Sequence, residues 1–85
     1  MHARATEVRS IRDLGSRIRE RRREAKLTAD QVAESASVSR RLVLEIEQGK
    51  RSNAGFSNVL RILEVLGLRL EVAPRGLPGT RPRGA

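Results

Sequence analysis

The sequence predicts an all-α fold: a bundle of about four short helices, followed by one C-terminal β-strand. Three observations support this prediction. Apolar residues recur at intervals of three and four, capping residues precede these stretches, and glycines follow them. The clearest alternation of apolar and polar residues comes late in the chain, over residues 68–72. The chain has 85 residues, which is room for one small domain.

The first predicted helix begins at Ile11 and is strongly basic. Ile11, Leu14 and Ile18 share one face, at intervals of three and four. The other faces mix two glutamates with five arginines, namely Arg17, Arg19, Arg21, Arg22 and Arg23. This helix should therefore bury one narrow apolar stripe and present charge elsewhere.

The second predicted helix begins after Thr28. Thr28 is a good N-cap, and Gln31, three residues further on, completes a capping box. The apolar face consists of small side chains, Val32, Ala33 and Ala36. A larger residue at Ala33 would push the neighbouring helices apart, so we expect close packing here.

The third predicted helix follows after a short turn, with Ser39 as its N-cap, and ends at Gly49. Val43 and Ile46 anchor it, and the remaining face is polar, with Ser39, Arg40, Arg41 and Glu45. Two short helices joined in this way predict a helix-turn-helix, whose second helix enters the major groove of DNA. An ordinary helical hairpin is the alternative, but charge, turn length and capping together favour DNA binding.

The fourth predicted helix starts at Gly55 or Ser57 and ends at Gly67. It is the most apolar part of the chain, so we expect it at the centre of the core: Phe56, Val59, Leu60, Ile62, Leu63 and Leu66. In the following strand, one side carries Leu68, Leu70 and Val72. A lone strand leaves its backbone groups unpaired, so we expect it to pair with its copy in a two-fold homodimer. An extended tail with chance alternation is the alternative.

The flanking segments differ from the helical region in composition. Residues 1–10 show no period and are expected to be a flexible arm, and residues 74–85, rich in Pro, Gly and Arg, a disordered basic tail. This leaves residues 11–73 as the ordered domain. The arginines of both flanks are equally consistent with phosphate contacts and with no role.

The charge balance indicates a polyanionic partner. Lys and Arg number 18 against 10 Asp and Glu, which gives a net charge of +8. Phe56 is the only aromatic residue, so the stacking platforms of RNA and single-strand binders are missing, and double-stranded DNA fits best. No apolar run is long enough to span a membrane, and the N-terminus lacks the apolar core of a signal peptide. We therefore expect a cytoplasmic protein, associated with the nucleoid when bound to DNA.

The sequence gives no indication of an enzyme, a cofactor or a metal site. It has no cysteine, and His2 is its only histidine. No glycine-rich phosphate loop follows a strand. Glu45 and Glu47 lie two positions apart on a helix, so their carboxylates face different directions.

The run LGSRIRERRREAKLTADQVAESASVSRRLVLEIEQGK resembles the Cro/C1-type repressors, a helix-turn-helix family. This resemblance implies base reading by Arg40, Arg41 and Glu45, and phosphate contacts from Ser39 and the start of the second helix. The predicted DNA-binding set is Thr28, Ala29, Ser39, Arg40, Arg41, Leu44, Glu45 and Lys50. Leu44 is unusually apolar for this position, and a thymine methyl or a protein partner would suit it.

The same resemblance carries two structural implications. It implies a partly buried ion pair between Arg22 and Glu47, which would link the first helix to the end of the third. The family usually has glycine where this chain has Ser37, which implies a slightly strained turn.

The C-terminal part, SNVLRILEVLGL followed by RLEV, resembles the HipB-type antitoxins. This resemblance implies a dimerising strand, repression of the protein's own operon and binding of a HipA-like kinase toxin. A symmetric dimer would bind a palindromic operator. Two alternatives stay open: a stand-alone transcriptional regulator with the same fold, and a protein-interaction module that no longer reads DNA.

Overall fold

The computed structural model describes residues 7–51 and 53–76. It contains the four predicted helices in order: α1 (Ile11–Glu24), α2 (Ala29–Ala36), α3 (Arg40–Glu47) and α4 (Phe56–Val65). The expected arm over 1–10 and the expected tail over 74–85 lie mostly outside the described residues.

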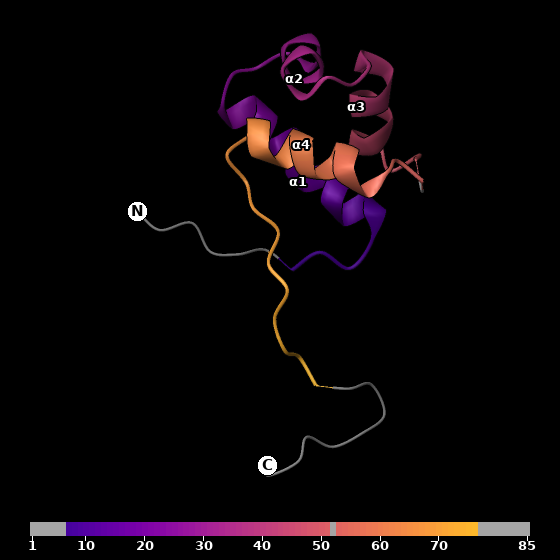
Figure 1. Cartoon of the computed structure of the whole chain (residues 1–85), viewed down its shortest axis with the longest axis vertical. Coiled ribbons are helices and arrows are strands. Elements are labelled where there is room, and N and C mark those ends of the chain that lie inside the picture. The colour runs from indigo at the N-terminus through magenta and orange to yellow at the C-terminus, as the bar shows by residue number, and fades with distance from the viewer. Residues whose placement is uncertain (1–6, 52, 77–85) are drawn as a thin grey trace.

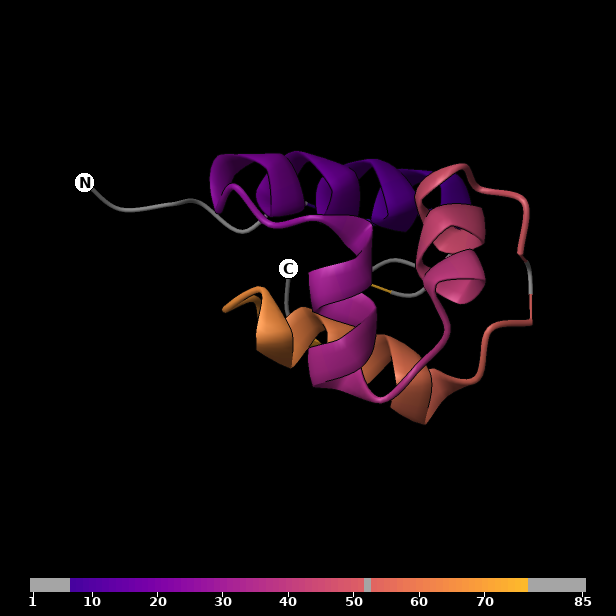
Figure 2. The same cartoon turned by 90° about the horizontal axis from the view of Figure 1, so that it is seen from above.

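The helices form a small bundle in which α1 and α4 lie on opposite sides (Figure 2). α2 and α3 connect them: α3 packs against both α1 and α2, and α4 packs against α2. After α4 the chain runs away from the helices (Figure 1). The bundle therefore has α2 and α3 as neighbours, as a helix-turn-helix requires.

α2 and α3 begin with the caps that the sequence predicts, and α1 has a further cap that was not predicted from the sequence. The Thr28 hydroxyl accepts a hydrogen bond from the Gln31 amide, and the Gln31 side chain accepts one from the Thr28 amide at 2.8 Å. The Ser39 hydroxyl accepts from the amide of Leu42 at 3.0 Å. Ser10 caps α1 in the same manner. These bonds satisfy amides that have no partner within their own helix.

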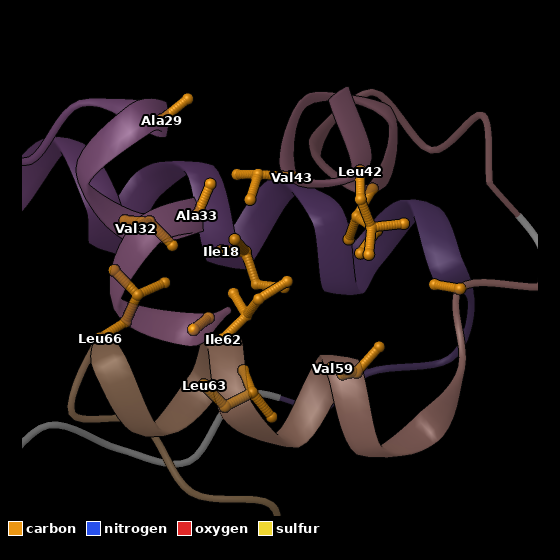
Figure 3. Close-up of a cluster of buried hydrophobic side chains, with 13 residues drawn as sticks. Ile18, Ala29, Val32, Ala33, Leu42, Val43, Val59, Ile62, Leu63 and Leu66 are labelled. Carbon is orange, nitrogen blue, oxygen red and sulfur yellow. The ribbon is translucent and has the colours of Figure 1, made fainter. Parts of the chain in front are cut away.

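One apolar cluster holds the bundle together, and each helix contributes to it (Figure 3). Its largest fully buried side chains are Ile18 from α1, Val32 from α2, Val43 and Ile46 from α3, and Ile62 from α4. Burying each such side chain contributes about 1.5–3 kcal/mol. Ala33 is also buried, at 4% exposed, which agrees with the close packing expected there.

The expectation that α4 lies at the centre of the core is met by only some of its apolar residues. Phe56 is 66% exposed and Leu60 is 39% exposed, whereas Val59, Ile62 and Leu63 are buried. A helix at the edge of a bundle turns only one face inward, and residues 56 and 60 lie four positions apart on the outer face. The total apolar content of a helix does not tell which of its residues are buried.

α1 and α3 approach each other closely at Gly15. A Cβ atom placed on Gly15 would lie 1.9 Å from the carbonyl oxygen of Ile46 and 3.0 Å from that of Glu47. Real Cβ atoms do not approach backbone oxygens this closely. The absence of a side chain at Gly15 is therefore what allows α1 to lie against the end of α3.

Two arginines cap the ends of other helices. Arg21 of α1 donates from Nε to the carbonyl oxygen of Leu66, at the end of α4, with a distance of 2.8 Å. Arg61 of α4 donates from Nε to the carbonyl oxygen of Ala36, the last residue of α2, at 3.0 Å. A cation at a helix C-terminus satisfies carbonyls and matches the helix dipole. Some arginines that the sequence places on a solvated face thus tie helices together.

The turn between α2 and α3 has the strain that the resemblance implies. Ser37 has φ of 57°, in the left-handed region that glycine adopts without cost. The Val38 amide donates to the Ala33 carbonyl at 2.9 Å, and the Ser37 amide donates to that of Glu34 at 3.2 Å. This pair of bonds is a Schellman motif, which explains why residue 37 must be left-handed.

The predicted strand over 68–72 is not a strand in the part of the chain that the structure describes. Leu68 packs against the core, while Leu70 is 47% exposed and Val72 is 94% exposed. A strand requires a second strand for its backbone hydrogen bonds, and the described residues of one chain provide none. The pairing between two subunits therefore stays a prediction.

Candidate nucleic-acid interface

The candidate interface is built on α2, the turn after it, and α3. The inner face of α3 carries Leu42, Val43 and Ile46, which are buried and fix the helix against α1 and α2. Burial of this face leaves the opposite face of α3 to the solvent. Packing thus fixes the first turn of α3, and the outward side chains of this turn are accessible to a ligand.

The two arginines predicted to read bases lie on this outer face. Arg40 and Arg41 are the first two residues of α3, and their side chains are 63% and 85% exposed. The first turn of a recognition helix is the part that comes nearest to the base edges. These two side chains are therefore placed where they can reach into a major groove.

The predicted phosphate-contacting residues lie at the starts of α2 and α3. Thr28 and Ser39 are both exposed, and each uses its hydroxyl oxygen to cap its helix. A capping hydroxyl still has its hydrogen to donate, so both residues can also bond a phosphate oxygen. Ala29 differs, because it is only 7% exposed and its methyl group belongs to the core. Ala29 can offer a ligand little more than its backbone.

The remaining predicted residues lie further along α3 and beyond it. Leu44 is half-buried and packs against the core, so only part of its side chain can touch a thymine methyl. Lys50 is exposed in the loop after α3. Glu45 is half-buried, with its side chain 24% exposed.

Ion pairs join the arginines of this face to two carboxylates. Arg40 Nε lies 3.2 Å from Asp30 Oδ1, which links the first turns of α3 and α2. Glu45 Oε2 lies 3.3 Å from Arg41 Nε, and Glu45 Oε1 lies 2.7 Å from Arg51 Nη1. Asp30 and Arg51 lie outside the DNA-binding set predicted from the sequence. Arg51 follows Lys50 directly in the loop, and this adjacency is the signal that could have identified it.

Arg22 and Glu47 lie in direct contact beneath this face. Arg22 donates from Nε and Nη2 to the two carboxylate oxygens of Glu47, at 2.6 and 2.9 Å. Arg22 also donates from Nη1 to the carbonyl oxygen of Leu27 at 3.0 Å. Their side chains are 14% and 3% exposed. The pair therefore ties α1, the loop before α2 and the end of α3 together, away from solvent.

The hydrogen bonds to Glu47 raise the pKa of the Arg22 guanidinium above its ordinary value. Burial opposes this effect, but more weakly. Arg22 thus keeps its charge inside the bundle because the carboxylate compensates for the water it has lost.

Comparison with known proteins identifies the family. Residues 13–75 match a family model described as a helix-turn-helix domain. The chain belongs to this helix-turn-helix family. The match includes α2, the turn and α3, and it extends through α4 to the segment that follows. The matched residues thus include every part of the candidate interface.

A curated relative supports the same assignment. The chain is 31% identical over 72 residues to y4mF of Sinorhizobium fredii, which is named as an uncharacterized HTH-type transcriptional regulator. The alignment covers 85% of this chain and 93% of the relative, so the two helix-turn-helix proteins correspond over nearly their whole lengths.

The described residues contain neither a metal-binding cluster nor a membrane-spanning helix. Within residues 7–51 and 53–76, acidic and histidine side chains form no group of three that could hold a metal ion. Over the same ranges, no helix is both long and apolar enough to cross a bilayer.

Proposed function

We propose that this protein is a dimeric, sequence-specific transcriptional repressor that binds double-stranded DNA. The observation that carries the proposal is the exposure of Arg40 and Arg41 in the first turn of the second helix of a helix-turn-helix. An arginine side chain can bond O6 and N7 of guanine together, so we expect G·C pairs in each half-site. Thr28, Ser39 and Lys50 would bond the neighbouring phosphates and set the register of the helix.

The first prediction concerns base reading by the two arginines. Arg40→Ala or Arg41→Ala should weaken binding to the operator by about 1–3 kcal/mol, because each variant loses one base contact. The loss should depend on particular G·C pairs of the operator. The measurement is a set of binding isotherms on the operator and on single-base-pair variants of it. Arg23→Ala is the control, since Arg23 is an exposed arginine on α1. An equal loss of affinity for operator and random DNA would show that Arg40 and Arg41 contact the phosphates of DNA rather than the bases.

The dimer would form through residues 68–72. Leu70 and Val72 are exposed apolar side chains in an extended, unpaired segment, and pairing with a second copy would cover them. Antiparallel pairing of identical strands fits two-fold symmetry. Two recognition helices in such a dimer would reach half-sites about 34 Å apart, which is one turn of DNA. A palindromic operator follows from this arrangement.

The second prediction tests the dimer. Leu70→Pro should convert dimers to monomers, because proline removes a backbone donor from the proposed strand pair and disturbs its register. Sedimentation equilibrium at micromolar concentration measures the outcome. Ala73→Pro, just outside residues 68–72, is the control and should leave the dimer intact. An unaltered chain that sediments as a monomer would contradict the proposed interface.

A finer proposal concerns the role in the cell. The similarity of the C-terminal part to HipB-type antitoxins favours an autorepressor that also binds a HipA-like kinase toxin. The experiment is co-expression with the product of the neighbouring gene, followed by purification of this chain. Recovery of a kinase-like protein in a stoichiometric complex supports the antitoxin role. If the neighbouring gene encodes another kind of protein and its product does not co-purify with this chain, the stand-alone regulator is the role that remains.

A further inference from the structure

The surface proposed to face DNA carries a cluster of acids and arginines, joined in two separate sets of ion pairs, that base reading alone does not explain. We call it the acid–arginine cluster, and it consists of Asp30, Arg40, Arg41, Glu45 and Arg51. It draws on α2, α3 and the loop after α3. Two carboxylates therefore lie on the surface that, under the proposed function, faces the phosphates of DNA.

The exposed ion pairs of this cluster account for little stability, although Asp30 also lies in the first turn of α2, where the helix dipole favours an acid. Asp30 and Arg40 have side chains 73% and 63% exposed, and Arg41 is 85% exposed. Ion pairs between such exposed groups add little to folding, since water screens them and ordering long side chains costs entropy. Near DNA, an acidic side chain is also repelled by the phosphates. Two acids on a face that meets phosphates would weaken DNA binding, so a gain in specificity would offset this cost.

The contacts show which part of each arginine is held. Asp30 lies against Nε of Arg40, and Glu45 accepts a hydrogen bond from Nε of Arg41. Nε is the guanidinium nitrogen nearest the backbone, so a carboxylate placed there restrains the side chain while the terminal nitrogens point onward. The terminal nitrogens supply the two donors that match O6 and N7 of guanine.

Glu45 has both carboxylate oxygens engaged. Oε2 accepts from Arg41 and Oε1 accepts from Nη1 of Arg51 at 2.7 Å. Its side chain is 24% exposed, compared with 85% for Arg41. Glu45 therefore lies beneath the arginines and has little freedom to accept a hydrogen bond from cytosine. A glutamate on a recognition helix can accept a hydrogen bond from cytosine N4 or orient an arginine, and the contacts of Glu45 favour the second role.

We propose that Asp30 and Glu45 are positioning residues that set sequence specificity by orienting Arg40 and Arg41 for guanine. They do so at the expense of total affinity, because each carboxylate also repels phosphates. Arg51, held by Glu45 at the edge of the same face, would contact the DNA backbone beside Lys50. The inference rests on the proposed function and adds residues outside the helix-turn-helix positions predicted from the sequence.

The test separates specificity from affinity. Asp30→Asn and Glu45→Gln each remove one charge but keep the size of the side chain. The dissociation constant is measured for a selected operator and for random DNA, with the full-length unaltered chain as reference. We expect both variants to bind random DNA more tightly, and the ratio of operator to random affinity to fall about five- to tenfold, which is part of the value of one bidentate contact.

Two further variants control the result. Glu34→Gln removes an exposed negative charge one helical turn from Asp30 on α2, and it should change both affinities equally. Asp30→Glu keeps the carboxylate and should recover part of the lost specificity. An unchanged ratio in Asp30→Asn and Glu45→Gln, or the same ratio change in Glu34→Gln, would overturn the inference. If the unaltered chain shows no preference among DNA sequences, the proposed function fails instead.

Discussion

Glu47→Gln is expected to destabilise the folded protein by about 3–5 kcal/mol, because it leaves the Arg22 guanidinium buried without its counter-charge. Arg22 is 14% exposed, and two of its nitrogens bond the Glu47 carboxylate. A neutral amide can accept only one of these bonds well and carries no charge. Small domains have folding free energies near the lower end of about 5–15 kcal/mol, so this loss would remove most of the stability.

Urea denaturation of the two variants Glu47→Gln and Glu20→Gln provides the comparison. Glu20 pairs with Arg17 at 2.8 Å, but the Glu20 side chain is 65% exposed. Loss of that exposed pair should cost less than about 1 kcal/mol. Equal, small losses in the two variants would show that burial of the Arg22–Glu47 pair has no energetic consequence. A double variant, Arg22→Met with Glu47→Leu, should be milder than the sum of the single changes.

The local signals in the sequence predicted local structure well. Thr28 with Gln31, and Ser39 before an apolar stretch, predicted the starts of α2 and α3, because an N-cap depends only on residues within one turn. Gly49 after α3 has φ of 70°, as a glycine that ends a helix commonly does. The order of the four helices and the polar outer face of α3 followed from the same kind of evidence.

Other features depend on how the helices cross, and the sequence did not specify this. The exposure of Phe56 reflects which face of α4 meets α2, and the apolar content of the helix gave no sign of it. The contact between Asp30 and Arg40 joins residues ten positions apart, on different helices. Arg21 and Arg61 cap helices distant in sequence for the same reason. Pairing of residues 68–72 requires a second chain, so neither one sequence nor one subunit determines it.

Gly15 is the clearest residue whose role appears only in the structure. An isolated glycine within a helical pattern costs about 1 kcal/mol relative to alanine, which signals a packing reason without identifying the neighbour. The neighbour is the backbone of α3 at Ile46 and Glu47. The same contact brings α1 to the end of α3, where Arg22 meets Glu47. The close approach at Gly15 and the buried ion pair thus join the same two helices, so we expect a change in one to affect the other.

Gly15→Ala should consequently destabilise the protein, although alanine is the better helix former. Its Cβ would lie 1.9 Å from the Ile46 carbonyl oxygen, so α1 must move away from α3. Overpacking of this kind costs typically about 1–3 kcal/mol. Because the obstacle is backbone and the Arg22–Glu47 bonds would be stretched, we expect a net loss of about 2 kcal/mol or more, even after the gain in helix propensity.

Thermal and urea denaturation of Gly15→Ala and Ser16→Ala test this prediction. Ser16 is the next residue of α1 and is exposed, so Ser16→Ala should be neutral or slightly stabilising through helix propensity alone. The two changes place the same side chain at adjacent positions of one helix, and only the first meets α3. A Gly15→Ala protein that melts at or above the temperature of the unaltered chain would show that α1 and α3 can separate without cost. In that case α1 would already lie further from α3 and water would reach the Arg22–Glu47 pair, so Glu47→Gln should produce a smaller loss in the Gly15→Ala background than in the unaltered chain.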